Sequence, residues 1–403
     1  MPFGLPSNLT DEIFLLFAIN FILESQHTFQ LIPMKITCSR KKFSAKFNQA
    51  AAYALPNSGI IFRYVVIDAE AGRVVFSAGN HDISVRVVLK DAEIGSEGRV
   101  ILPPRLMKEF LQAATSETVK LERKGGVLRM SAGRIIREIP VSDVSDFPEI
   151  PPFTGKAYHE VIGSDLLKCI KRTSFVPSKD SKYILTGVLF ELTGNEINAV
   201  STDRCRLSWQ RMKAVPHGGQ SAENSAVVSL KTLNEVKKVI GKDGAELPVK
   251  IAVEGGKIIF VTAGDEIAII SRPLEGRFPA WRKFIPKKTG RATALVSIRN
   301  FRAAVRQLKE MTTKDKPGLL LDFRPGTLEI SAGGNAGKKS ARSVPITYGG
   351  KEVTTKLNPN FLTDFIRSIP GERSLSISLK ENGPVLFELP QESGFAYVLM
   401  PLA

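Results

Sequence analysis

The stretch that decides the fold is VLFELTGNEINAVSTDRCRL, which runs from Val188 to Leu207. Apolar residues recur on both sides of Gly194-Asn195, a dipeptide typical of a tight turn between antiparallel strands. A second, looser turn is predicted around Asp203. Similar stretches precede and follow it, IIFRYVVIDAEAGRVVFSAGNHDISVRV at residues 60–87 and LLLDFRPGTLEISAGGNAGKKSARSV at residues 319–344. A unit that recurs three times at such spacing indicates a repeated domain.

Each third of the chain divides again into two similar halves, and each half has one predicted helix. Pro104 suits the first turn of a helix, and Ser164 is a candidate N-cap. The second helix of each third leads into a hairpin, because Gly-Gly or Asn-Gly separates two alternating segments. These turns are predicted at Gly125-Gly126, Gly255-Gly256 and Asn382-Gly383. The helices are predicted at Phe43–Tyr53, Pro104–Ala114, Ser164–Arg172, Leu230–Ile240, Ile298–Met311 and Pro359–Ile369.

The predicted fold class is therefore α+β, with three repeated domains that each pack two helices on antiparallel sheets. Proline-rich junctions at residues 146–151 and 277–286 separate the domains, because proline favours extended connectors. The predicted boundaries are 34–152, 153–288 and 289–403. Residues 1–33 differ in character from the rest, and Met34 is the expected true start. This leader is predicted to be a poorly ordered extension or a wrongly placed start, with an amphipathic anchor as the alternative.

The composition points to a polyanionic partner. The chain has 403 residues, and its 56 Lys and Arg exceed its 40 Asp and Glu, for a formal net charge of +16. Such an excess favours nucleic acid, with an anionic membrane or a plain basic surface as alternatives. The three cysteines, Cys38, Cys169 and Cys205, have spacings that indicate neither a disulfide framework nor a zinc site. A reducing cytoplasm is the expected setting, and no metal or cofactor is expected.

The predicted helices carry much of the positive charge. In the helix predicted at Ile298–Met311, apolar residues occupy one face at helical spacing, and Arg299, Arg302 and Arg306 occupy another. Taken singly, each such face is a solvated basic surface. If the repeats close around an axis, the faces line one surface that contacts phosphates without reading bases. The candidate DNA contacts on the helices are Lys168, Lys171, Arg172, Lys238, Arg299, Arg302 and Arg306.

Four motifs, in order along the chain, match a known family. They are Tyr183–Phe190 (YILTGVLF), Thr202-Asp203 with Arg206-Leu207, Gly276–Pro279 (GRFP) with Ile285-Pro286, and Tyr397–Pro401 (YVLMP). With them, the chain resembles the β subunit of bacterial DNA polymerase III, the sliding clamp, from Met34 to its end. The motifs are specific because all four lie in register over three repeats.

The resemblance implies a head-to-tail homodimer that closes into a ring of six domains around double-stranded DNA. Such a ring tethers the DNA polymerase during replication and makes or breaks no bond, so no enzyme activity is expected. The implied protein partners are the DNA polymerase III catalytic subunit and the clamp loader, which bind through short apolar peptide motifs. A cytoplasmic protein without a membrane partner is expected.

The resemblance also implies sites. The partner-peptide groove is expected at Leu185, Thr202, Arg204, Cys205, Arg206, Leu207, Pro279, Phe284, Val398, Met400, Pro401 and Leu402. A DNA-facing loop adds Lys179, Lys182 and Tyr183 to the DNA contacts. The dimer interface is expected at an edge strand, residues 134–140, with Ile135 and Ile136 available for pairing. The chain departs from the family at Arg204-Cys205, where Gly-His is usual, and Gly permits backbone angles that Arg adopts poorly.

Two other functions stay open at this point. One is a divergent clamp-like protein that binds DNA without sequence preference and forms no closed ring. The other is an enzyme that acts on nucleic acid. Against the enzyme, the sequence contains no evident carboxylate cluster for Mg²⁺, no Gly-rich phosphate loop with Lys and no Cys/His metal motif.

Overall fold

The computed structural model describes most of the chain after the leader. The described residues are 33–402, apart from 55–60, 142–146, 148, 178–182, 219–223, 242–243, 263, 265, 288, 313–316, 334–338, 370 and 372–373. The predictions for the leader therefore fall outside the described residues, except at Pro33. None of the helices in the described part is both long and apolar enough to cross a membrane.

The first repeat consists of two halves, and each half has the predicted order of a short strand, a helix and further strands. Its helix α2 begins three residues earlier than predicted, because Ser39 accepts a hydrogen bond from the Lys42 backbone N–H and caps it. The elements are β1 (Met34–Ser39), α2 (Arg40–Ala51), η1 (Ile61–Arg63), β2 (Val65–Glu70), β3 (Arg73–Gly79), β4 (Ile83–Leu89), β5 (Ala92–Ser96), β6 (Gly98–Leu102), α3 (Pro104–Ala113), β7 (Thr118–Lys124), β8 (Val127–Ala132) and β9 (Ile135–Pro140).

The second repeat contains the stretch that decides the fold. Strands β11 and β12 pair around the predicted turn at Gly194-Asn195, and β13 follows the turn at Asp203. One local prediction was wrong: α4 begins at Gly163 rather than after a Ser164 cap. Within the YILTGVLF motif, Tyr183–Thr186 form a 3-10 turn before the strand. The elements are β10 (Tyr158–Ile162), α4 (Gly163–Thr173), η2 (Tyr183–Thr186), β11 (Gly187–Thr193), β12 (Glu196–Thr202), β13 (Arg206–Lys213), β14 (Val215–His217), β15 (Asn224–Ser229), α5 (Leu230–Ile240), β16 (Pro248–Glu254), β17 (Lys257–Thr262) and β18 (Ile267–Ser271).

The third repeat closes the chain with the same pattern. The connector that leads into it includes η3 (Trp281–Phe284). The elements are β19 (Ala292–Ser297), α6 (Ile298–Lys309), β20 (Leu319–Arg324), β21 (Thr327–Gly333), β22 (Lys339–Thr347), β23 (Val353–Leu357), α7 (Pro359–Ser368), β24 (Ser374–Leu379), β25 (Val385–Glu388) and β26 (Phe395–Leu399). The α+β class, with three repeats of two helices on antiparallel sheets, is confirmed.

Strand pairing joins each repeat to the next. The last strand of the second repeat, β18, pairs with β4 of the first, and the last strand of the third, β26, pairs with β13 of the second. Two sheets therefore cross the junctions, with nine and twelve strands. The third sheet, β5-β1-β7-β8-β9, belongs to the first repeat alone and ends at β9.

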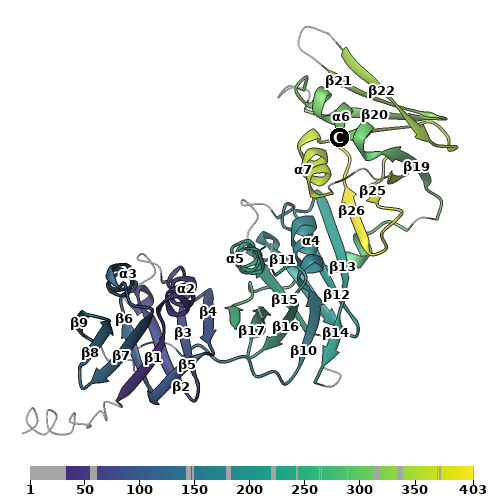
Figure 1. The fold of residues 1–403 in the computed structure, drawn as a ribbon. Helices are drawn as coiled ribbons and strands as arrows, with labels where there is room; N and C mark the ends of the chain where they lie inside the picture. Colours follow the sequence, from purple (N-terminus) through teal and green to yellow (C-terminus); the bar gives the residue numbers. More distant parts are fainter. Residues whose placement is uncertain are drawn as a thin grey trace, which may run out of the picture.

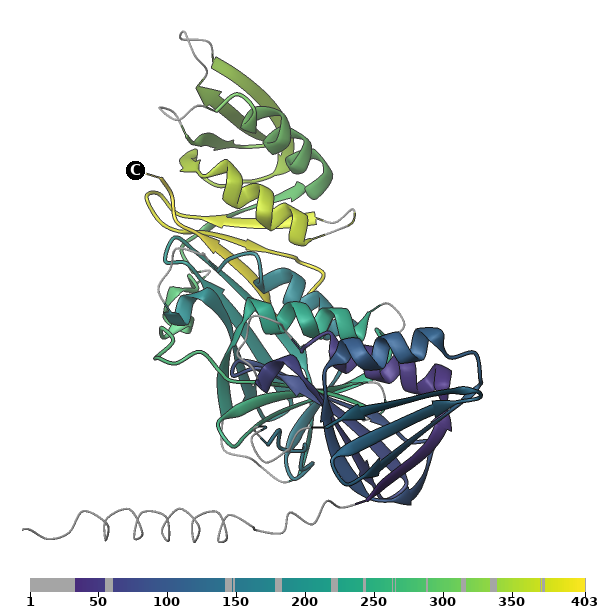
Figure 2. The same ribbon diagram turned by 90° about the vertical axis from the view of Figure 1, so that its left-hand side faces the viewer.

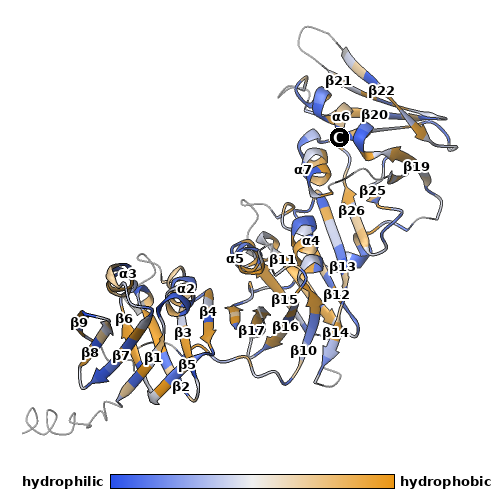
Figure 3. Ribbon diagram, in the orientation of Figure 1, coloured by the Kyte–Doolittle hydropathy of each residue, from blue (hydrophilic) through white to orange (hydrophobic). Residues whose placement is uncertain are grey.

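The three repeats form a crescent, as Figure 1 shows. The six helices of the described part lie along its concave side, and the sheets form its convex side. The two helices of each repeat lie next to each other in both views (Figures 1 and 2). Hydrophobic residues colour much of the strands, whereas the helices carry both hydrophobic and hydrophilic residues (Figure 3). The helices thus bury one face on the sheets and turn the other toward the concave side.

Aromatic side chains fill the core of the third repeat. Phe365 of α7 is fully buried and stacks on Tyr397 with 4.7 Å between ring centroids, while Phe387 lies 5.1 Å away. Burial of such side chains holds the helix on the sheet that also forms the junction, because apolar area removed from water is the main stabilising term.

We predict that Phe365→Ala lowers the free energy of unfolding by about 3–5 kcal/mol, because it leaves a cavity in this aromatic cluster. Urea unfolding followed by circular dichroism measures the change. Met311→Ala is the control, since Met311 is 45% exposed and surface changes stay within about 0.5 kcal/mol. Equal losses in both variants would contradict this account of the core.

Candidate functional site: a groove at the second junction and a basic concave face

A groove of about 640 Å³ lies where the second and third repeats join. Its floor is apolar and buried, and Phe284 and Met400 extend it as exposed apolar side chains, 57% and 48% accessible. We call this surface the junction groove. Its lining residues are Ile184, Leu185, Thr202, Arg204, Cys205, Arg206, Leu207, Arg277, Pro279, Lys283, Phe284, Pro286, Pro384, Val398 and Met400.

The turn between β12 and β13 shapes one wall of the junction groove. Asp203 accepts hydrogen bonds from the backbone N–H groups of Cys205 (3.0 Å) and Arg206 (2.9 Å). Thr202 donates its hydroxyl to the Arg206 carbonyl (2.8 Å). This network holds Arg204 at φ 78°, a left-handed conformation that favours Gly. Arg204 therefore occupies a position with Gly-like backbone geometry and adds a cationic side chain to the groove.

Arg206, a buried residue of the groove lining, links the second repeat to the third. Its guanidinium pairs with Asp203 (2.9 Å) and Asp364 (3.0 Å), and it also donates to the Phe175 carbonyl (3.2 Å). The Phe361 ring lies 4.1 Å from the guanidinium carbon. Burial alone would lower the pKa of Arg206, but Tyr397 and the two carboxylates outweigh it and raise the pKa. Its charge is therefore neutralised within the protein.

The groove residues expected from the sequence mostly come together. Ten of the twelve line the junction groove, and the two exceptions, Pro401 and Leu402, do not. The Leu402 backbone N–H bonds to the Lys356 carbonyl (2.8 Å), so the tail leaves the groove along β23. Sequence reasoning missed Ile184, Arg277, Lys283, Pro286 and Pro384. The first four lie inside or beside the matching motifs, whereas Pro384 follows the predicted Asn382-Gly383 turn, which belongs to none of those motifs.

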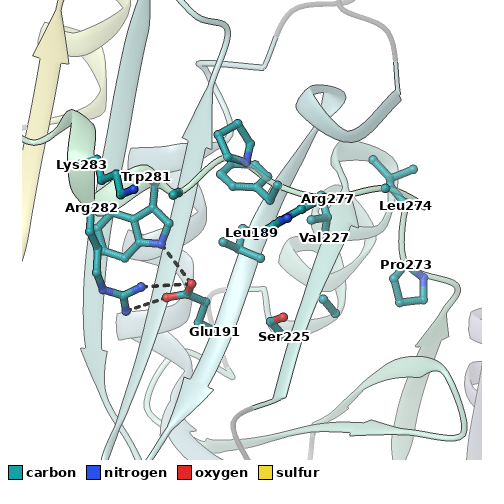
Figure 4. Close-up of a pocket in the computed structure, with 15 residues that line it drawn as sticks. Leu189, Glu191, Ser225, Val227, Pro273, Leu274, Arg277, Trp281, Arg282 and Lys283 are labelled. Carbon is teal, nitrogen blue, oxygen red and sulfur yellow. Dashed lines mark hydrogen bonds and ion pairs between the residues drawn. The ribbon is translucent and has the colours of Figure 1, made fainter.

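A second cavity of about 600 Å³ lies across the connector from the junction groove. We call it the connector cavity (Figure 4). Leu189, Val227 and Leu274 lie in its wall, and Glu191 accepts a hydrogen bond from the Trp281 indole N–H (3.1 Å) and pairs with Arg282 (2.8 Å). These bonds hold the connector on the β11 strand. Both cavities share the residues Arg277, Pro279 and Lys283.

The helices concentrate positive charge on the concave side. Together α2 to α7 hold 17 Lys or Arg but only four Asp or Glu, a much larger excess than the 56 to 40 of the whole chain. Of the expected DNA contacts, those with exposed side chains are Lys171, Lys238, Arg299, Arg302 and Arg306. The concave side is therefore a polyelectrolyte surface suited to phosphates.

Arg172 does not belong to this surface, and its placement on the exposed face of α4 was wrong. It is 3% exposed and bonds to Gln210 (2.8 Å) and Glu392 (2.7 Å), while the Phe395 ring lies 4.7 Å from its guanidinium carbon. Glu392 comes from the third repeat, so Arg172 links the repeats. Lys168 is only partly exposed and pairs with the same Glu392 (2.8 Å).

Other expected contacts fall at the limits of the described residues. Lys179 and Lys182 lie outside them, and only the backbone of Tyr183 is described, as the first residue of η2. The expected edge strand is β9, which ends its sheet. Ile136 is 54% exposed on it, and Ile135 packs partly against the core. Among the described residues, no three His, Cys, Asp or Glu side chains are grouped so as to hold a metal ion.

Comparisons with known proteins agree with these features. Residues 34–151 match the family model of the DNA polymerase III beta subunit N-terminal domain, and residues 160–280 match that of its central domain. A beta sliding clamp of Streptomyces coelicolor is 25% identical over 351 residues, which cover 84% of this chain and 90% of that protein. A Streptomyces muensis protein named beta sliding clamp homolog GriR is 23% identical, with 88% and 94% covered. The Bacillus subtilis DNA polymerase sliding clamp structure superposes with a TM-score of 0.78 at 20% identity, over 92% of this chain and 99% of that one.

We predict that one thiol, that of Cys205, reacts with Ellman's reagent in the native protein and that all three react in urea. Cys205 is exposed, whereas Cys38 and Cys169 are buried. Burial raises the pKa of Cys38 to about 12 and raises that of Cys169 as well, so both stay protonated and unreactive at pH 8. Cys205→Ser is expected to abolish the native reaction, and any thiol of that variant that reacts in the native state would refute the prediction.

Proposed function

This chain belongs to the family of DNA polymerase III beta subunits, and from that premise we propose that it is a DNA sliding clamp. Two copies close into a ring around duplex DNA and hold a replicative polymerase on its template. The family is not catalytic, so the task is topological: the ring need only stay closed and slide. The observation that carries the proposal is a crescent with its cationic helices on the concave side. At one end the edge strand β9 is unpaired on one side, and at the other β22 pairs with β19 only at Ile346 and Thr347, so residues 339–345 pair on the β21 side alone.

The proposed contact with DNA is electrostatic. Exposed Arg and Lys on the concave helices meet phosphates, which supplies affinity without base readout. Long flexible side chains on a rigid helix face can exchange one phosphate for the next, which permits sliding. The candidates in this role are Lys171, Lys238, Arg299, Arg302 and Arg306, and Lys168 contributes less because Glu392 neutralises it.

The two internal junctions predict how the ring closes. Ser77, Val200 and Ser331 are equivalent in the three repeats, and they pair with Arg86, Trp209 and Ala341 on the next strand. At the junctions, Arg86 faces Ala268 and Trp209 faces Ala396.

If two copies join in the register of the internal junctions, a strand of the first repeat of one copy pairs with a strand of the third repeat of the other. The first-repeat equivalent of Ala268 is Ile136, because Val261 faces Ala268 as Ser131 faces Ile136 after matching Gly-Gly turns. We therefore propose that β9 of one copy pairs with β22 of the other, with Ile136 opposite Ala341. Both residues are exposed in the single chain, and pairing removes two open sheet edges.

The junction groove is the proposed docking site for partner peptides. Its volume and apolar floor suit a few side chains of an extended segment, and its polar rim can orient the backbone. Polymerase and clamp loader compete for such a surface, since each uses a short segment.

We predict that a Cys205→Ser protein carrying Ile136→Cys and Ala341→Cys forms a covalent dimer with a short bis-maleimide, because the proposed register puts the two thiols opposite each other. Denaturing gel electrophoresis measures the product. The matched control replaces Ala341→Cys by Glu329→Cys on β21, because Glu329 is paired on both sides, with Asp322 and Ser343, whereas Ala341 is paired with β21 alone. A covalent dimer of the control, or none in the test protein, argues against the register.

We further predict that the protein is a dimer in solution by light scattering and that, after loading, it stays on nicked circular DNA and leaves linearised DNA. A ring held by topology resists salt on circles, whereas purely electrostatic binding falls steeply with salt on both forms. A monomer that binds circles and linear DNA equally would replace the clamp by a basic DNA-binding protein without a closed ring.

A further inference from the structure

The charge of the junction groove is one-sided. Its lining residues include Arg204, Arg206, Arg277 and Lys283, and none of its lining residues within the described chain is Asp or Glu. Arg206 is neutralised by Asp203 and Asp364. The other three cations pair with no carboxylate among the described residues. The groove thus offers an apolar floor beside positive charges that the protein itself does not neutralise.

The positions of these cations are informative. Arg277 and Lys283 are exposed and belong to the lining of both the junction groove and the connector cavity. The one carboxylate that lines the connector cavity, Glu191, is engaged by Trp281 and Arg282, as Figure 4 shows. The boundary between the two cavities is therefore positive, with apolar surface on either side.

Both cavities lie on the same face of one sheet. A single buried cluster underlies them, with Leu207 and Val398 below the groove and Leu189 and Val227 below the connector cavity; Trp281 belongs to the same cluster. An extended chain can therefore cross the connector from one cavity to the other while it keeps to one surface.

Arg204 adds a cation to the groove wall at a backbone position whose conformation favours Gly. An Arg at φ 78° is strained, and its side chain is exposed at the groove wall. A cation kept at a strained position beside an apolar groove fits a role in recognition, because strain of this kind is retained where it serves a site.

We propose that the junction groove selects an extended partner segment in which apolar side chains are followed by acidic ones. The apolar side chains occupy the groove, and the carboxylates lie at the boundary with the connector cavity, opposite Arg277 and Lys283, with Arg204 as a further cation at the wall. This inference rests on the proposed docking role of the groove and adds the chemical class of the partner. Charge complementarity of this kind contributes specificity and association rate.

The test starts with a random twelve-residue peptide library displayed on phage and panned on the full-length protein. Peptides that lose binding after Cys205 is alkylated are groove ligands, because Cys205 lines the groove. We expect these ligands to be enriched in Asp and Glu next to an apolar pair. Groove ligands without an acidic excess would overturn the inference and leave the docking role intact. A library with no groove ligand would overturn both.

Charge reversal then tests the named residues. Fluorescence anisotropy with the best labelled peptide is expected to show at least tenfold weaker binding to an Arg204→Glu, Arg277→Glu, Lys283→Glu protein, and a peptide with its acids changed to Lys should recover the loss. Lys287→Glu is the matched control, since Lys287 is exposed and lines neither cavity. Unchanged affinity in the triple variant overturns the inference, as does full displacement of the peptide by a single-stranded oligonucleotide, which would assign the cations to phosphates.

Dimer mass and retention on circular DNA separate this inference from the clamp function. The triple variant is expected to keep both, because none of its changes lies on β9, β22 or a concave helix. Loss of ring formation in this variant would show that the three cations serve assembly, which would overturn their assignment to the partner.

Discussion

Antiparallel pairing between strands of different repeats is the constraint on which the rest of the structure depends. A sheet that ends in an unpaired edge exposes backbone N–H and C=O groups, and pairing with a neighbour satisfies them. Here β18 with β4 and β26 with β13 satisfy two such edges inside the chain. Because the same face of each repeat carries its helices, repeated pairing bends the chain into a crescent with α2 to α7 on the concave side.

The same pairing creates the junction groove. At the end of β26 the chain passes beside the β12–β13 turn, and the Met400 N–H bonds to the Cys205 carbonyl (2.9 Å). Arg206 and Arg172 reinforce this junction from within, each through carboxylates of the third repeat. Removing one member of such a buried pair costs several kcal/mol in general, so the junction tolerates little change. The groove is thus as rigid as the pairing beneath it.

The positive charge of the chain divides into two kinds by burial. Arg172 and Arg206 are buried and neutralised, so they hold the second repeat to the third. Exposed cations on the helices and at the groove are free of that task and face outward to partners. Basic side chains therefore have two roles: buried ones hold the repeats together, and exposed ones are available to bind partners.

Most of the secondary structure could be predicted from the sequence because its signals are local. Helical spacing located the six helices within a few residues, and Gly-Gly or Asn-Gly turns located the hairpins. Ten of the twelve residues expected from the motifs lie together in the junction groove, and their docking role stays a prediction. At the turn, Arg204 has the positive φ that favours Gly. The edge position of β9 was expected from the family resemblance, and the sheet order agrees with it.

What the sequence by itself determined were the elements, their threefold recurrence and the excess of basic residues on the helices, since these depend on neighbours within a few positions. Only the tertiary structure decided which cations remain exposed. Arg172 looks like Lys171 in a helical pattern, yet it is buried because Glu392, 220 residues away, lies against it. Only the fold, likewise, brings Pro384 beside Leu185 and Thr202 to complete the groove. Contacts between distant segments depend on how sheets pair and pack, and residue spacing along the chain carries no direct record of that.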